Sequence, residues 1–279
     1  MRAAAIQLNS NQEKSRNLAV AGSLLREAAA DGAELAVLPE KFNVLGGPDD
    51  LRAGAEPVPG PTTDWAAALA RELGLWLVAG SIVERVEGDD KLRNTSVLVG
   101  PDGELHATYN KLHLFDVEVE GTVYRESDAE APGDEEVVAD AGGLRIGMAV
   151  CYDLRFPELF RIMALRGARA ISLPSAFTVP TGRAHWEVLV RARAIENQVF
   201  MIAAGQIGKH PPHHESYGHS MIVDPWGVVL AEAPDEECFV AADLDLEAQE
   251  QVREKLPSLA HRRPEAYRWP QPVALGAAS

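Results

Sequence analysis

The sequence predicts an α/β protein made of two similar halves, each a sheet covered by helices. Along most of the 279 residues, short apolar runs of strand length alternate with stretches that have helical apolar spacing. The order strand, helix, strand, helix, strand, hairpin occurs twice, although the letters of the two halves do not match. No segment rich in Pro, Gly or Ser separates them, so we expect one domain over residues 1–260 and a tail over 261–279.

The first half contains three predicted strands, two helices and a hairpin. Apolar runs predict the strands, and amphipathic spacing predicts the helices between them. The strands are expected at residues 2–8, 34–38 and 75–85, and the helices at 14–32 and 64–74. Two further strands flank the Pro-Asp-Gly turn at 101–103, which is typical of a hairpin.

The second half repeats this order with different residues. The run Leu144 to Val150 predicts a buried strand, and the stretch after it has helical spacing with Gly167 as the expected stop. The remaining expected elements are a strand at 168–177, a helix at 185–198, a strand at 200–208, and a hairpin of 220–224 with 228–233. From Leu256 onward periodicity is lost, and we expect this tail to pack on a neighbouring molecule or to fray.

Composition excludes several functional classes. The formal net charge of −16 argues against nucleic acid or an anionic membrane as a partner, since both require clustered Lys and Arg. No apolar stretch approaches the ~18 residues that span a bilayer, and the N-terminal run is too short for a signal peptide. Two cysteines provide no disulfide framework, which favours a reducing cytoplasm.

Cys151 lies where α/β enzymes often place a nucleophile, at the turn between a buried strand and a helix. A nearby helix N-terminus would favour the thiolate. A small buried hydrophobic residue is the alternative interpretation, and the one that applies to Cys238 within its apolar run.

Three charged residues complement this thiol. Glu40 follows the strand LAVL and Pro39, Lys111 follows the hairpin strand in YNKLHLF, and Glu126 lies in the loop RESDAEAPG. Taken singly, each could be a solvated or snorkelling surface residue. Together, a carboxylate can take the thiol proton, and a lysine can stabilise the oxyanion formed when a thiolate attacks a carbonyl.

The segments LPE (38–40), YNKLHLFD (109–116) and CYDLRFPELF (151–160) resemble the three catalytic motifs of the nitrilase, or carbon–nitrogen hydrolase, superfamily. The resemblance extends from AAIQL to about HRRPEAY. It implies a four-layer αββα sandwich in which Glu40 is the general base, Lys111 the oxyanion-stabilising cation and Cys151 the nucleophile. Glu126 matches the additional active-site glutamate. The resemblance further implies a homodimer or larger assembly and no cofactor.

The second half resembles the branch that contains deaminated glutathione amidase, with omega-amidase close by. PSAFTVPTGRAHWEVLVRARAIENQ followed by SYGHSMIVDPWG carries this resemblance, which implies a small carboxylated amide, such as an α-keto acid omega-amide, as substrate. Tyr152, Arg155, Ser175 and Thr181 are then expected to contact substrate, and the Arg fork suits a carboxylate. The stretch GKHPPHHE is less basic than its counterpart in that branch, so an N-carbamoyl amino acid, an aliphatic amide and a nitrile remain alternatives.

The histidines of the second half allow two other interpretations. His210, His213, His214 and His219 could hold a metal, but their spacing fits no familiar zinc pattern, so no metal site is expected. A Cys-His protease arrangement of Cys151 with His185 or His219 explains fewer segments than the Glu and Lys set. A non-catalytic thiol sensor is the most distant alternative.

Overall fold

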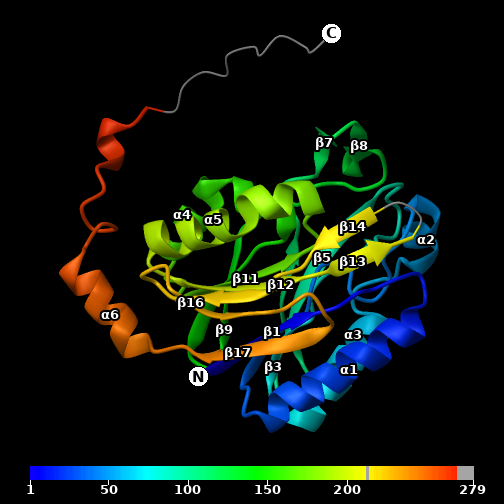
Figure 1. The fold of residues 1–279 in the computed structure, drawn as a ribbon, viewed down its shortest axis with the longest axis horizontal. Helices are drawn as coiled ribbons and strands as arrows, with labels where there is room; N and C mark the ends of the chain where they lie inside the picture. The colour runs from blue at the N-terminus through cyan, green and yellow to red at the C-terminus, as the bar shows by residue number, and fades with distance from the viewer. Residues whose placement is uncertain (212–213, 269–279) are drawn as a thin grey trace.

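The computed structural model describes residues 1–211 and 214–268 and has four layers (Figure 1). Helices α1 (Lys14–Ala30) and α3 (Pro61–Leu73) cover one outer face, and α4 (Pro157–Leu165) and α5 (Val179–Asn197) cover the other. Two sheets lie between these helix layers, one contributed mainly by each half of the chain. The prediction of two sheet-and-helix halves packed together is therefore confirmed.

The first sheet has the strand order β17-β1-β2-β3-β5-β4, and β6 also pairs with β5. Its first three strands in sequence are parallel, as their helical crossovers require. The predicted hairpin is present as the antiparallel pair β5–β6. The bounds are β1 Arg2–Gln7, β2 Leu35–Val37, β3 Trp76–Val78, β4 Ile82–Arg85, β5 Leu92–Val99, β6 Leu105–Asn110 and β17 Cys238–Asp243.

The second sheet has the order β16-β15-β12-β11-β10-β9. As in the first sheet, three central strands are parallel and the strands on either side of them pair antiparallel. Strands β10, β11 and β12 are parallel, and the second predicted hairpin is β15–β16. The bounds are β9 Val137–Ala141, β10 Leu144–Met148, β11 Ala170–Ser175, β12 Phe200–Gly205, β15 Met221–Val223 and β16 Val229–Glu232.

Strand β1 shows how the layers are held together. Ala3 and Ala5 pack in the core between the sheets, against β10–β12 residues such as Met148. Ala4 and Ile6 point the other way and pack with α1 and α3. Successive side chains of a strand point to opposite faces, so an all-apolar strand is required where both faces are covered. This arrangement explains the uninterrupted apolar runs of the sequence.

Three predicted elements differ from the structure. The expected strand over 75–85 is divided into β3 and β4, because Gly80 adopts a φ of +48° and turns the chain. Cys238 is only partly buried, because β17 is an edge strand rather than a central one. The helix expected at 185–198 begins earlier, at Val179.

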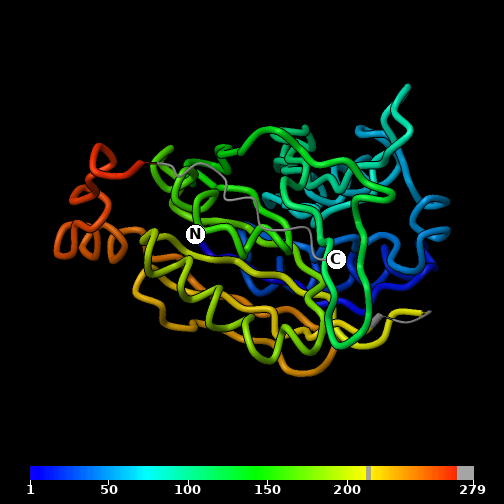
Figure 2. Tube along the Cα trace, turned by 90° about the horizontal axis from the view of Figure 1, so that it is seen from above, coloured from blue at the N-terminus to red at the C-terminus, as the bar shows by residue number. Residues whose placement is uncertain are grey.

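Several short elements were not predicted. They include α2 (Pro48–Gly54), the hairpin β7–β8 (Asp116–Val119 and Thr122–Arg125), the edge strand β9, the pair β13–β14 (Ile207–His210 and His214–Tyr217), and α6 (Leu246–Lys255). Helix α6 is polar, and Asp245 caps it by accepting a hydrogen bond from the Ala248 N–H. Seen from above, α6 and the residues after it as far as 268 project away from the layers (Figure 2). The prediction of a tail from residue 261 is partly outside the described residues, which end at 268.

No helix in residues 1–211 or 214–268 has the length and apolar character needed to cross a membrane.

Candidate active site

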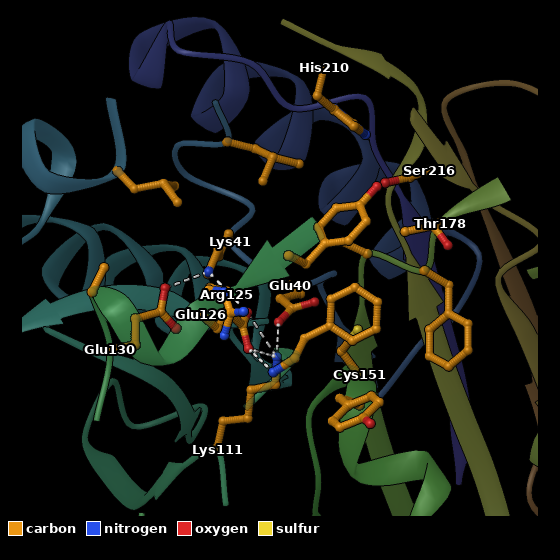
Figure 3. A pocket seen from close by; sticks show the side chains of 18 of the residues that line it. Glu40, Lys41, Lys111, Arg125, Glu126, Glu130, Cys151, Thr178, His210 and Ser216 are labelled. Atoms are coloured by element: carbon orange, nitrogen blue, oxygen red, sulfur yellow. Dashed lines mark hydrogen bonds and ion pairs between the residues drawn. The ribbon is translucent and has the colours of Figure 1, made fainter. Parts of the chain in front are cut away.

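A cavity of about 330 Å³ opens where the strands that precede the predicted catalytic residues end. Glu40 comes three residues after β2, Lys111 directly follows β6, and Cys151 comes three residues after β10. All three line this cavity, and Glu126, which follows β8, lines it as well (Figure 3). The structure therefore brings together the four residues that the sequence predicted, from four separate loops.

Cys151 begins a 3-10 turn, η2 (Cys151–Arg155), with a left-handed φ of +49°. Such a backbone is uncommon for a residue with a side chain and persists only when neighbours hold it. Asp153 supplies that support, because its fully buried carboxylate accepts hydrogen bonds from the Val150 N–H at 2.8 Å, the Tyr109 hydroxyl at 2.7 Å and the His113 N–H at 3.1 Å. The Cys151 thiol is thus presented at a fixed point of the cavity wall.

Glu40 is buried and fixed by two donors. Its Oε1 accepts a hydrogen bond from Asn94 Nδ2 at 2.8 Å and lies 3.1 Å from Lys111 Nζ. Its backbone carbonyl accepts a further bond from Gln206, which joins the loop to the end of the second sheet. Lys111 also donates to both oxygens of Glu126, at 3.0 and 2.7 Å. A base and a cation are therefore held beside the thiol.

A second lysine and a third carboxylate extend this cluster, and sequence reasoning missed both. Lys41 Nζ lies 2.6 Å from Glu130 Oε1 and 3.4 Å from Glu126 Oε1. Both side chains are buried and line the cavity, and dashed lines in Figure 3 join them. The available signals were proximity in sequence: Lys41 directly follows Glu40, and Glu130 follows Glu126 by four residues in a loop assigned to the surface.

Charges in this cluster stabilise one another. Burial alone would lower the pKa of Lys111, but the carboxylates of Glu126 and Glu40 raise it well above its ordinary value, so the ammonium persists. Burial likewise opposes ionisation of Glu126, yet Lys111 and Lys41 lower the pKa of this carboxyl to about 2. Both groups are therefore charged at neutral pH.

The expected help of a helix N-terminus to the thiolate of Cys151 is not found, and the thiol is protonated at rest. Burial, followed by the negative charge of Glu40, raises the pKa of this thiol well above its usual range, and Lys111 offsets only part of that shift. The helix that was expected to favour the anion, α4, begins six residues later at Pro157. A protonated nucleophile needs a base beside it, and the neighbouring carboxylate of Glu40 meets that need.

Three of the four predicted substrate contacts line the cavity: Tyr152, Arg155 and Thr181. The Arg155 guanidinium lies over the rings of Tyr152 and Phe177, 5.8 and 5.4 Å from their centres. The fourth predicted contact, Ser175, does not line the cavity. It is fully buried at the end of β11, where its hydroxyl donates to the Leu173 carbonyl, and Ala176, Phe177 and Thr178 form the cavity wall instead.

His185 and His219, the histidines considered as protease partners of Cys151, do not line its cavity. His185 is exposed on α5, 3.3 Å from Arg155 Nη1, and His219 lies 2.9 Å from Glu232. His210 lines the cavity and its Nδ1 lies 2.7 Å from the Ser10 carbonyl. Within residues 1–211 and 214–268, no group of three His, Cys, Asp or Glu residues is arranged to hold a metal, and His213 lies outside these residues.

Comparison with known proteins identifies the family. Residues 2–254 match the family model for carbon–nitrogen hydrolases. Omega-amidase NIT2 from Bos taurus is 41% identical over 95% of this chain and 96% of its own length, and deaminated glutathione amidase from Bos taurus is 44% identical over 95% and 82%. The crystal structure of the C. elegans NitFhit protein has a TM-score of 0.89 at 38% identity; the match covers 96% of this chain and 66% of that one. The chain therefore belongs to the carbon–nitrogen hydrolase family.

Membership confirms the α/β sandwich fold, and it makes the protein a hydrolase that acts on the C–N bonds of amides. The fold positions the cavity by placing the loops after β2, β6, β8 and β10 around it.

Gly80 is predicted to be essential for placing Glu40. A Cβ at this position would lie 2.1 Å from the Pro39 carbonyl oxygen, and the φ of +48° already disfavours a side chain. We expect Gly80→Ala to lower the free energy of unfolding by more than the roughly 1–3 kcal/mol that left-handed strain costs. It should also lower kcat/KM, because Pro39 directly precedes Glu40.

Gly74→Ala is the matched control for this substitution. Gly74 has a φ of +66°, but nothing lies within 4 Å of a Cβ built there. It should therefore show the strain penalty alone, with parental kcat/KM. Urea denaturation and amide hydrolysis measure the two effects, and equal stability and activity of the two variants would contradict the role given to Gly80.

Proposed function

We propose that the protein hydrolyses a small carboxylated amide through a thioester on Cys151, with deaminated glutathione or a related α-keto acid omega-amide as the substrate. The observation that carries the proposal is the buried contact of Lys111 with Glu40, 3.1 Å apart, beside the thiol in the cavity. A binding protein would gain nothing from a base and a cation at a thiol. The names of the two relatives above support the substrate class.

The mechanism follows from this arrangement. Glu40 takes the proton of the Cys151 thiol as the sulfur attacks the amide carbonyl. Lys111 and the backbone N–H of Tyr152 stabilise the negative charge that develops on the carbonyl oxygen. The C–N bond then breaks, Glu40 returns the proton to the leaving nitrogen, and the acyl group remains as a thioester on sulfur.

Hydrolysis of the thioester reuses the same groups. Glu40 removes a proton from a water molecule, whose oxygen attacks the thioester carbonyl, and Glu126 helps to position that water. The C–S bond breaks, the sulfur regains its proton, and the carboxylic acid leaves. Every step is a proton transfer, an addition or an elimination, so the mechanism uses no cofactor.

Arg155 is proposed to bind the carboxylate of the substrate. It lines the cavity, and its contacts with Tyr152 and Phe177 hold the guanidinium in place. Loss of a charge-assisted hydrogen bond costs about 1.5–3 kcal/mol, so Arg155→Met should raise KM for a carboxylated amide by roughly 10- to 150-fold. An uncharged amide of similar size should show no such rise; equal effects on both would refute carboxylate recognition.

A three-substrate assay tests the proposed class. Purified protein is incubated separately with deaminated glutathione, α-ketoglutaramate and an N-carbamoyl amino acid. Release of Cys-Gly from the first, or of ammonia without carbon dioxide from the second, supports the proposal. Release of both ammonia and carbon dioxide from the third alone would assign the protein to the carbamoyl hydrolases instead, and hydrolysis of a simple aliphatic amide or nitrile alone would also overturn the substrate class.

We also propose a homodimer or larger assembly in the cytoplasm. Helices α4 and α5 expose Ile162, Leu165, Val188 and Ile195, and apolar side chains gathered on neighbouring helices favour an interface. The two free cysteines favour a reducing compartment. Light scattering of the purified protein should give a multiple of the 30.1 kDa chain mass, whereas a monomer would reject the assembly.

A further inference from the structure

The cavity contains a charged pair that the proposed mechanism does not use. Lys41 and Glu130 come from different loops, after β2 and after β8, and meet at 2.6 Å. The exposed fractions of their side chains are 7% and 3%. A buried ion pair is costly to form, because both ions lose their hydration, and it adds little net stability compared with apolar residues of the same size. The position of this pair therefore calls for an explanation.

Position suggests the explanation. Lys41 Nζ lies 3.4 Å from Glu126 Oε1, and the same carboxylate binds Lys111 through both oxygens. The charges thus alternate along a chain from Glu40 to Lys111, Glu126, Lys41 and Glu130 (Figure 3). Glu126 is the central member, with one lysine on each side.

Glu126 is enclosed by ionisable groups. Lys111 approaches from the end of β6 and Lys41 from the loop after β2, and the Phe115 N–H donates to Glu126 Oε2 at 2.8 Å. The other charged or titratable residues that line the cavity are Glu40, Tyr124, Arg125, Glu130, Cys151, Tyr152, Arg155, His210 and Glu215. Without Lys41, the three carboxylates of Glu40, Glu126 and Glu130 would be left with the single ammonium of Lys111.

We propose that Lys41 is a positioning residue that keeps Glu126 ionised, so that Glu40 alone receives the proton of Cys151. The inference rests on the proposed roles of Glu40 and Cys151 but not on which amide is cleaved. If Glu126 took up a proton, it would lose the charge that binds Lys111, and the cation beside the thiol would be less firmly held. Lys41 prevents this by stabilising the anion from the side opposite Lys111.

Glu130 has the supporting part in this arrangement. It is the closest carboxylate to Lys41, and its Oε2 is buried without a hydrogen-bond partner in the described part of the chain. Burial, reinforced by the neighbouring Glu126, raises the pKa of Glu130, whereas the pKa of Glu126 falls to about 2. Of the two carboxylates that share Lys41, Glu126 is therefore the one that stays ionised as the pH falls.

The test uses a charge-matched double variant. With all five side chains ionised, the cluster holds two lysines and three carboxylates, and Lys41→Met with Glu130→Gln leaves one lysine and two carboxylates. Its net charge is thus unchanged at −1, but Glu126 has lost its second cation. Glu130→Gln alone is the matched control, because it keeps Lys41 against Glu126.

The measurement is the rate of Cys151 alkylation by iodoacetamide as a function of pH, read by peptide mass spectrometry alongside kcat/KM. Alkylation requires no knowledge of the natural substrate, so it remains informative if the proposed amide is wrong. The partly buried Cys238 is an internal reference, because its pH profile should be the same in all variants.

The double variant should lose reactivity on the acid side. An opposite charge within a few ångströms lowers a carboxyl pKa by about 1–3 units, so removing Lys41 should raise the pKa of Glu126. The acid limb, which is the low-pH part of the alkylation profile where the rate falls, should then move upward by about one pH unit or more. At a pH below the acid limbs of both the parent and the double variant, a shift of one unit makes alkylation of Cys151 roughly tenfold slower in the double variant. In Glu130→Gln the limb should stay at the parental pH or lie below it.

Two results would overturn the proposal. An unmoved acid limb in the double variant, even with uniformly slower alkylation, would make Lys41 a structural residue only. The same upward shift in Glu130→Gln would assign the effect to Glu130. If the double variant does not fold by circular dichroism, Lys41→Gln with Glu130→Gln removes the same charges while keeping polar side chains, and the same limits apply to it.

Discussion

Replacing Cys151 by alanine should abolish amide hydrolysis and leave the protein folded. Removing a covalent nucleophile typically costs several orders of magnitude, and we expect kcat/KM to fall by at least about 10⁴-fold. The fold should persist, because the loop geometry depends on Asp153 and its three donors rather than on the thiol. Steady-state hydrolysis and thermal unfolding followed by circular dichroism measure the two effects.

Cys238→Ala is the matched control, since it removes the other free thiol from edge strand β17. It should keep parental kcat/KM. Substantial hydrolysis by Cys151→Ala, at a parental melting temperature, would rule out the thioester route. A fall of similar size in Cys238→Ala would show that the assay reports stability rather than chemistry.

Replacing Glu40 by glutamine should block activation of the thiol. The substitution is isosteric, and an amide oxygen can still accept the bonds that Asn94 and Lys111 now donate to Glu40 Oε1. Only the ability to take a proton is lost. Because burial, the largest cause of the raised pKa of Cys151, remains in this variant, a thiol without its base stays protonated at neutral pH. General-base catalysis contributes about 10²- to 10⁴-fold, and acylation should slow by that factor.

Rapid-quench measurement of acylation in a single turnover isolates this step. Glu84→Gln is the control, because Glu84 is a part-buried carboxylate on β4 that accepts a hydrogen bond from Thr95 at 2.6 Å but does not line the cavity. It should acylate at the parental rate. If Glu40→Gln also did so, another group would be the base.

The sequence predicts the strands and helices that have a strong pattern. Apolar runs covered on both faces, such as β1 and β11, and hairpins with a Pro-containing turn were found. Polar α6 was missed because it packs mainly through one buried residue, Gln249, although its Asp245 cap was a readable signal. The break at Gly80 was missed because the backbone it turns against is distant in sequence: the Ser81 N–H donates to the Pro39 carbonyl.

The catalytic candidates could be predicted from their chemistry and their places after strands. The residues that hold them in position could not be predicted. A thiol, a base and a cation each follow a strand, and the ends of neighbouring strands meet in space. Lys41, Glu130 and Asp153 do their work through contacts between loops, which no local spacing encodes. For Cys151 itself, only the expected influence of a helix N-terminus was wrong, because burial and the Glu40 charge raise the pKa of the thiol and α4 begins only at Pro157.

The central claim is that the acyl group passes through Cys151. The most direct test is intact-protein mass spectrometry of acid-quenched turnover mixtures, with hydroxylamine added in parallel to trap a thioester as a hydroxamate. The account predicts an acyl adduct that maps to the Cys151 peptide in the parent, hydroxamate among its products, and neither in Cys151→Ala. Steady turnover by the parent that yields neither adduct nor hydroxamate would contradict it, as would oxidation of Cys151 as the sole modification.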